Sequence, residues 1–356
     1  MRALLGALAL LGALASAASA DGELTMRGAY YKERATRVVQ PMLDGKLTIG
    51  EHGTAEGHLL IDAITSASIS AGAADTAFTE RRYEAGGGYG HELPWGKLRG
   101  ELRVSREPDY LSFFVGGGGE LSLAEDNAVV ALGAGYGHDD VSNAGARGPF
   151  TEKIEGNLQT LLVSASVSQV LSTHVLASVG YDLSHLRGFQ QNPYRMVEIG
   201  ASSFPEQHPD VRTRHALAAT IKAYVEPART TVIASYRLYF DSWGVVANTP
   251  ELRAVRALGD AIELGARYRF HQQSAADFFE RIYAAQERYL SDDEKLSRFT
   301  SHTAEAKVAV LGAALGLSGR WEEVRGELLV QYLHQNNRFG DAVSAQAALT
   351  IPFSDP

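Results

Sequence analysis

Ionisable side chains recur at every second position along several segments of this sequence. In one such segment, Arg99, Glu101 and Arg103 alternate with glycine and leucine. Side chains two residues apart share one face of a β-strand, so the segment has one charged and one apolar face. The candidates for a charged wall inside a closed sheet are Arg99, Arg103, Arg212, Arg214, Lys222, Arg237, Arg253, Arg267, Arg269, Glu101, Asp241, Glu251 and Glu263.

Such a wall acts through electrostatic interactions, and two interpretations of its role stay open. The mixture of signs favours a mutual salt-bridge network that braces the sheet, because Asp241, Glu251 and Glu263 share the face of the basic residues. The alternative is a basic wall that attracts anionic solutes, as charged rings do in pores. A weak preference for anions is then expected, and it depends on Arg237 and Arg269.

Other reactive side chains form no recognisable motif. His138-Asp139-Asp140 and Ser291-Asp292-Asp293-Glu294 offer metal ligands, but neither has the spacing of a known zinc or calcium site. No nucleophile elbow, P-loop or H-E-x-x-H string occurs. We therefore predict no metal site, no cofactor and no catalytic residue, and a barrel-borne hydrolase is the least favoured function.

The two-faced segments predict an all-β fold, a transmembrane antiparallel up-and-down β-barrel of about sixteen strands. A soluble sandwich also alternates, but its strands typically have about five or six residues. Many segments here have ten or more, the length that crosses a bilayer at a tilt. The expected strands are residues 23–32, 35–44, 55–68, 79–92, 97–106, 110–122, 127–139, 156–168, 173–185, 211–224, 229–241, 248–257, 260–272, 301–317, 323–335 and 342–353.

The connections between these strands sort by length when both termini are periplasmic. Long extracellular loops and short periplasmic turns are typical of bacterial outer-membrane barrels. The long connections are 69–78, 140–155, 186–210 and 273–300, and the short ones are 93–96, 123–126, 169–172, 225–228, 258–259 and 318–322. Residues 45–54 are an exception, as a longer inner connection. Aromatic residues between Ala275 and Leu290 recur at helical spacing, which favours a short helix in that outer loop.

The first twenty residues have the pattern of a secretory signal peptide. Met1-Arg2 is followed by an apolar run, and Ala18-Ser19-Ala20 offers small residues for cleavage. We predict cleavage after Ala20, which leaves residues 21–356 as a single outer-membrane β-barrel domain. The sequence contains no cysteine, and its net charge of −9 disfavours general nucleic-acid binding.

Four strings in fixed order carry a family resemblance over nearly the whole mature chain. They are Ser105-Arg106-Glu107-Pro108-Asp109-Tyr110-Leu111-Ser112, Asn192-Pro193-Tyr194-Arg195, Tyr236-Arg237-Leu238-Tyr239-Phe240-Asp241-Ser242-Trp243 and Tyr268-Arg269-Phe270-His271-Gln272-Gln273-Ser274-Ala275-Ala276-Asp277-Phe278-Phe279. The set resembles the uncharacterised bacterial outer-membrane barrel family, domain-of-unknown-function family three-five-seven-zero. The sequence departs from it at Ala247-Asn248-Thr249, where the family tends to have Ser-His-Thr.

The resemblance implies an outer-membrane barrel without catalytic residues. Genes of the family often neighbour a flavin transferase and a thioredoxin-like protein, which implies a flavinylated or thioredoxin-like periplasmic partner. The expected function is a pore or conduit that serves a periplasmic flavin-linked redox or transport system. The alternative is a plugged structural or docking barrel for a periplasmic partner. The other expected partner is outer-membrane lipid, and the oligomeric state stays open.

Overall fold

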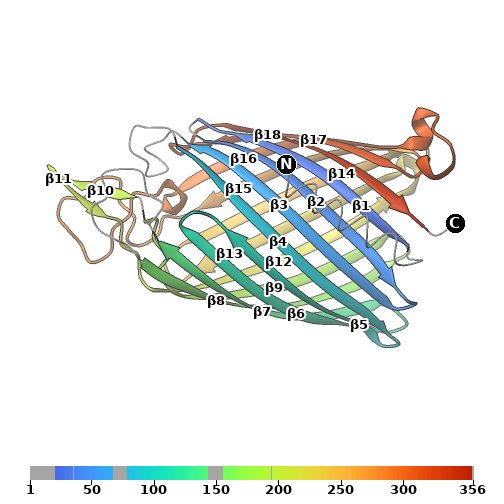
Figure 1. The fold of residues 1–356 in the computed structure, drawn as a ribbon, viewed down its shortest axis with the longest axis horizontal. Coiled ribbons are helices and arrows are strands. Elements are labelled where there is room, and N and C mark those ends of the chain that lie inside the picture. Colours follow the sequence, from blue (N-terminus) through green and yellow to red (C-terminus); the bar gives the residue numbers. More distant parts are fainter. Residues whose placement is uncertain (1–20, 35, 67–77, 143–154, 194, 355–356) are drawn as a thin grey trace.

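A single closed barrel dominates the computed structural model, which describes residues 21–34, 36–66, 78–142, 155–193 and 195–354 (Figure 1). Sixteen antiparallel strands form the barrel, as predicted, and β1 pairs with β18 to close it. The strands are β1 (Gly22–Lys32), β2 (Thr36–Ile49), β3 (Gly53–Ser66), β4 (Phe78–Leu93), β5 (Gly96–Arg106), β6 (Tyr110–Leu123), β7 (Ala128–Ser142), β8 (Glu155–Ser172), β9 (Val175–Gly188), β12 (Val211–Val225), β13 (Thr230–Asp241), β14 (Val246–Leu258), β15 (Ile262–Gln273), β16 (Phe299–Leu311), β17 (Arg325–Gln335) and β18 (Ala342–Phe353).

Two further strands lie outside the barrel wall. β10 (Met196–Ile199) and β11 (Ser202–Pro205) pair as a small hairpin at the end of the barrel opposite the C-terminus (Figure 1). The long connections gather at this end, so it is the extracellular one. The predicted signal peptide lies outside the described residues.

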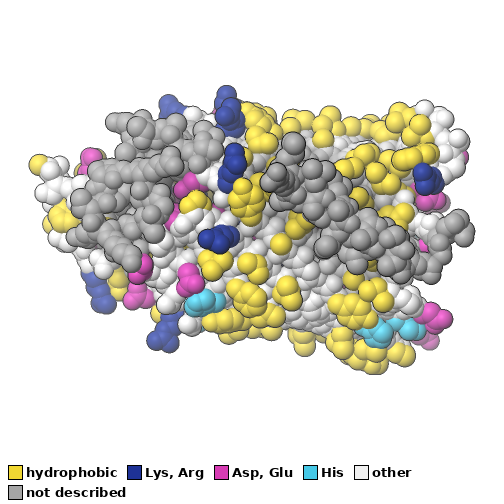
Figure 2. Space-filling view, viewed as in Figure 1, with side chains coloured by type: hydrophobic (Ala, Val, Ile, Leu, Met, Phe, Trp, Pro, Cys, Tyr) yellow, Lys and Arg dark blue, Asp and Glu magenta, His cyan; other side chains and the backbone are white. Residues whose placement is uncertain are grey.

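The outer wall of the barrel is apolar. Leu102, Leu132 and Val179 are more than half exposed, at 56%, 62% and 53%, and all three face away from the lumen. Figure 2 shows such hydrophobic side chains spread over the outside of the barrel. Lipid stabilises a wall of this kind, and a closed barrel leaves no backbone group unpaired at a sheet edge. The protein is therefore an outer-membrane barrel, as predicted. In the described part of the chain, no helix is long and apolar enough to span a membrane.

The inner connections differ from the prediction at two places. β2 continues to Ile49 and β3 begins at Gly53, so the expected long inner connection 45–54 is wrong, and only a short turn separates the strands. By contrast, β16 ends at Leu311, well before the expected residue 317. Residues 312–324 instead form the inner connection, with 3₁₀ turns at Gly312–Leu315 and Gly319–Trp321. Gly316 ends the first turn in the left-handed region, at φ 73°.

The short helix expected between Ala275 and Leu290 is absent from the structure. Its aromatic side chains do not share one face: Phe278 packs against Trp243, while Ile282 is 83% exposed. The hydroxyl of Tyr283 donates to the carbonyl of Phe278 and accepts from the amide of Ser291. These tertiary contacts satisfy backbone groups that a helix would otherwise pair. The helical spacing was therefore a misleading signal.

The two faces of β5 give a direct test of which residues face the lipid and which face the lumen. Leu102 faces lipid, whereas its neighbour Arg103 faces the lumen and lies 3.6 Å from Glu84 and 3.7 Å from Glu101. We expect Leu102→Arg to lower the free energy of unfolding by about 2–4 kcal/mol, because it places a charge in lipid near the middle of the bilayer. Arg103→Leu removes only half-exposed ion pairs, and we expect a loss below about 1 kcal/mol. Urea titration of protein folded into lipid vesicles measures both; equal losses would contradict the register.

Candidate functional site

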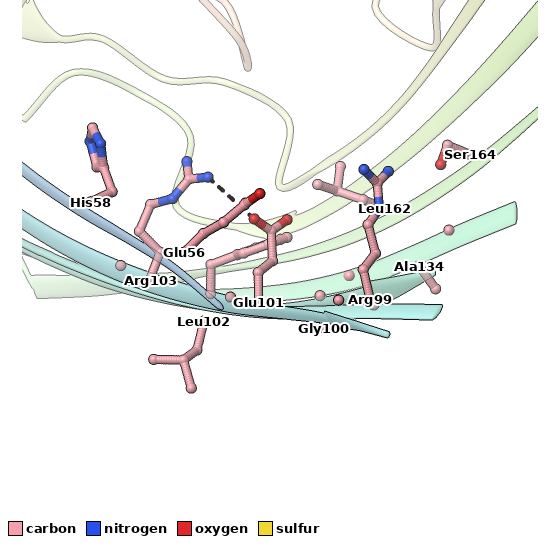
Figure 3. Close-up of a pocket in the computed structure, with 18 of the residues that line it drawn as sticks. Glu56, His58, Arg99, Gly100, Glu101, Leu102, Arg103, Ala134, Leu162 and Ser164 are labelled. Carbon is pink, nitrogen blue, oxygen red and sulfur yellow. Dashed lines mark ion pairs between the residues drawn. The ribbon is translucent and has the colours of Figure 1, made fainter. Parts of the chain in front are cut away.

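The barrel lumen contains a cavity of about 1190 Å³. Residues of β1–β9, β12 and β13 line it, whereas none of β14–β18 does. Figure 3 shows how β5 contributes to it: Arg99, Glu101 and Arg103 project into the cavity, and Leu102 points to the opposite side of the sheet. The cavity therefore occupies one half of the lumen and is lined by alternate residues of these strands.

The cavity exists because small side chains face inward on this half of the wall. The lining includes Gly86, Gly88 and Gly90 of β4, which alternate with outward-facing Ala85 and Tyr89. The other small lining residues are Gly116 on β6, Gly133 and Gly135 on β7, Ser164 on β8 and Ser184 on β9. Inward positions without bulk leave space that water can fill. The charged side chains of β5 project above this floor of glycine and serine.

Long charged side chains occupy the other half of the lumen. Glu251 on β14 accepts from Arg269 at 2.7 Å and from Arg267 at 3.3 Å, and Arg253 lies 3.5 Å away. Arg267 also binds Glu305 on β16. We call these five residues the Glu251 network. The structure thus brings together four of the predicted wall residues, and each of the three arginines meets a carboxylate, although the network has only two glutamates.

Residues that sequence reasoning missed complete this half of the wall. Glu263, a predicted wall residue, binds Arg325 of β17. Arg325 also binds Glu327 at 2.9 Å, and Glu327 accepts from Lys307 at 2.8 Å. Glu305 and Lys307 alternate with alanine in the expected strand 301–317, so the signal that found the other wall residues was present there as well.

Two predicted wall residues, Arg212 and Asp241, lie at the extracellular rim and do not line the cavity. The Asp241 side chain has no exposed surface and accepts from Arg212 Nε at 2.9 Å and from the Tyr239 hydroxyl at 2.6 Å. It also accepts from the amides of Trp243 and Val245 in the turn after β13. The Arg212 guanidinium stacks on the Trp243 ring at 4.1 Å. Arg212, Asp241 and Trp243 form the rim cluster, which fixes this turn against β12.

The remaining basic candidates lack acidic partners. Within the described ranges, Arg99, Arg214 and Arg237 have no carboxylate within ion-pair distance, and all three line the cavity. Lys222 lies nearer the periplasmic end of β12, outside the cavity lining. Apart from His58 and His215, the lining contains seven acidic and six basic residues. The cavity is thus nearly balanced in charge, with three arginines free to meet a solute.

A second polar cluster joins two extracellular connections outside the membrane. The Ser291 hydroxyl donates to Glu206 at 2.5 Å, and His208 and Arg195 lie 3.2 and 3.5 Å from the same oxygen. We call these four residues the loop cluster. Burial alone raises the pKa of Glu206, but His208, Arg195 and Ser291 together hold the pKa below its ordinary value.

The loop cluster has a serine and a histidine, yet its geometry is not that of a hydrolase. An activated serine donates to a general base and stays within reach of substrate. Ser291 instead donates to a carboxylate and has no exposed surface. The neighbouring acids also bind arginines: Asp292 and Asp293 each lie 3.5 Å from Arg195. This chemistry holds the connections together and leaves no open calcium site at residues 291–294.

One group of acids has the spacing of metal ligands among the described residues. Oxygen atoms of Glu80, Glu107 and Asp109 lie within 4.8 Å of one another at the extracellular end of β4 and β5. Arg82 lies beside them, 4.0 Å from Glu107 and 2.7 Å from Asp62. An adjacent guanidinium opposes cation binding, so we assign no metal here. His138 lies 3.4 Å from Asp140 and belongs to no group of three ligands in the described structure.

Because Asp241 and Arg212 form a buried ion pair at the rim, we expect removal of one charge to destabilise the fold strongly. Asp241→Asn leaves Arg212 buried without a counter-charge, and we expect the free energy of unfolding to fall by about 3–5 kcal/mol. Asp260→Asn is the matched control, since Asp260 pairs with Arg229 at 2.8 Å but is almost fully exposed. We expect little change there. Denaturant titration compares the two variants; an equally small effect for Asp241→Asn would contradict the role of the rim cluster.

The barrel is similar in fold to solved structures of other outer-membrane proteins. Among solved structures, it is similar to a bacterial polysaccharide outer membrane secretin, with TM-score 0.54, 8% identity, and 93% of this chain and 98% of the other covered. A BenF-like porin from Pseudomonas fluorescens Pf-5 gives TM-score 0.48 and 12% identity, with coverages of 94% and 98%. Pseudomonas aeruginosa OccK2 (OpdF), in complex with glucuronate, gives 0.46 and 10%, with coverages of 94% and 98%.

The secretin likeness supports the barrel fold and nothing beyond the fold, because its identity is so low. No curated protein sequence matches the chain. A family model matches residues 74–323, well over half of the chain, and its description is "Protein of unknown function (DUF3570)". This is the family that the four strings resemble. The chain therefore belongs to the DUF3570 family, and its fold is that of an outer-membrane β-barrel.

Proposed function

We propose that this protein is a pore for small hydrophilic solutes across the outer membrane. The observation that carries the proposal is the uneven lumen. Inward glycine and serine residues leave space beside the charged lining residues on one side, and the Glu251 network with its neighbours lies on the other. Such a division leaves a cavity of about 1190 Å³ that is lined by charged and polar side chains. Hydrated solutes partition into a wet, charged lumen more readily than into lipid.

The charges of the cavity suit a pore of weak selectivity. Acidic and basic lining residues nearly balance, and screening limits each charge to about 8 Å at physiological salt. Arg99, Arg214 and Arg237 have no acidic partner among the described residues, so they supply a local attraction for anionic groups of a solute. By contrast, each arginine of the Glu251 network already meets a carboxylate and lies outside the cavity lining, so it contributes less to this attraction.

A plugged docking barrel is the second candidate. It is favoured by the extracellular connections, since β10, β11 and residues 274–298 pack together at that end (Figure 1). The flavin-linked redox or transport system and its flavinylated or thioredoxin-like partner remain a prediction from the family resemblance. No feature of the described barrel wall adds support for either. Conductance in planar bilayers separates a pore from a plugged barrel.

The glycine and serine wall sets the conductance that we expect. Ser164→Trp adds a large ring to the cavity lining, and we expect single-channel conductance to fall by half or more. Leu161→Trp is the matched control on the same strand, because Leu161 is 48% exposed on the outer wall. We expect the conductance of this control variant to equal that of the parent protein. The measurement is single-channel recording in planar bilayers. An absence of conductance in the parent protein would favour the docking barrel.

Because Arg237 is unpaired and Arg269 is paired, we expect two variants that remove the same charge to differ in their reversal potential. Arg237→Gln removes an unpaired charge from the cavity, and we expect the reversal potential in a salt gradient to shift toward cation preference. Arg269→Gln removes the same charge from the Glu251 network, outside the cavity, and we expect a smaller shift. Equal shifts would mean that the two arginines face the permeating ions alike.

A further inference from the structure

A row of basic residues lies at the extracellular edge of the lipid-facing wall. Each of β1, β2, β4 and β5 carries one of them near its extracellular end. They are Lys32, Arg37, Arg81 and Arg106, and we call them the basic row. All four are exposed. Figure 2 shows Lys and Arg side chains on this face, between the apolar belt and the extracellular connections.

Strand alternation shows that the basic row faces outward. Lys32 shares its face with Tyr30, Arg37 with Val39, Arg81 with Tyr83, and Arg106 with Val104, one step along each strand. These four apolar partners are between 39% and 51% exposed and belong to the lipid-facing wall. The apolar face therefore ends in a cation on each of these strands, at the depth where lipid headgroups begin.

The four side chains of the basic row have no acidic partner in the part of the chain that the structure describes. In the described ranges, none of these four side chains forms an ion pair or a side-chain hydrogen bond. Lys32 and Arg37 are directly opposite each other in the β1–β2 register, where like charges repel. An arrangement of this kind is costly unless an anion lies between the cations.

Elsewhere around the same rim, several outward-facing polar residues have protein partners. His215 bonds to Tyr181 at 2.7 Å, and His302 bonds to Tyr268 at 2.7 Å. His334 bonds to Asp341 at 2.8 Å. The sector formed by β1–β5 differs because it gathers four unpaired cations, whereas Arg187 on β9 stands alone.

We propose that the basic row binds phosphate groups of the phosphorylated glycolipid in the outer leaflet, lipid A. Guanidinium groups bind phosphate oxygens in paired hydrogen bonds, and each cation near an anionic membrane surface adds to the attraction. The acyl chains of the same lipid lie along the apolar wall below, beside Tyr30, Val39, Tyr83 and Val104. One molecule class thus satisfies both the charges and the apolar residues of this sector.

The test uses the full mature protein in detergent and bisphosphorylated lipid A as the probe, with bound lipid counted by native mass spectrometry. We expect Arg81→Gln with Arg106→Gln to weaken binding on the order of tenfold or more. Arg187→Gln with Arg256→Gln is the control of equal charge. Both control residues are exposed and face outward, but Arg187 lies alone on β9 and Arg256 lies near the periplasmic end of β14.

Three outcomes decide the proposal. Selective loss in the first double variant, together with weak binding of dephosphorylated lipid A to the parent, supports it. Equal loss in both double variants, or equal binding of phosphorylated and dephosphorylated lipid A, overturns it. Binding of inorganic phosphate alone as tightly as lipid A also overturns it, since a site for free phosphate does not need the apolar wall. A folded-barrel shift in unheated gel electrophoresis verifies that each variant is folded.

Discussion

The rest of the structure depends on the pairing of backbone amides and carbonyls between neighbouring strands all around the barrel wall. Lipid offers no hydrogen-bond partners, so an open sheet edge inside a bilayer would be prohibitively unstable. Pairing of β1 with β18 removes the last edge, from Gly22 opposite Phe353 to Lys32 opposite Val343. Closure also fixes the direction of every side chain, because a strand that is paired on both sides cannot rotate. Leu102 must then face lipid, and Arg103 must face the lumen.

Within that frame, the lumen is divided by the size of the inward side chains. Strands β4 to β9 present glycine and serine at many inward positions, and the cavity lies above them. Strands β14 to β17 present arginine, glutamate and lysine, which reach one another across neighbouring strands. Ion pairs between partly buried groups have a desolvation cost, which is offset here because Glu251 meets three arginines and Arg267 meets two glutamates. The inward face of the barrel therefore has an ion-pair network that braces the wall on one side and a cavity on the other.

Sequence periodicity predicted the strands well because alternation is imposed by the membrane itself. It failed wherever contacts join distant segments. The spacing between Ala275 and Leu290 indicated a helix, yet Tyr283 and Phe278 are held by Ser291 and Trp243, which local periodicity cannot reveal. Asp241 shares the inward face of β13, but its role comes from the turn that follows and from Arg212 on another strand. Alternation identifies which face of the sheet a residue is on. Its height along the barrel and its interaction partner can be predicted only when the pairing register between neighbouring strands is known.

The loop cluster has a consequence for how the extracellular end moves. Gln207 and Leu290 exchange backbone hydrogen bonds, Ser291 binds Glu206, and Trp243 stacks against His208 and Phe278. Three connections far apart in the chain thus share one small core. Segments with a shared core open as one cooperative unit, so local unfolding of any of them exposes the others. Amide exchange in residues 195–210 and 276–297 should then follow a common opening rate, separate from that of the barrel strands.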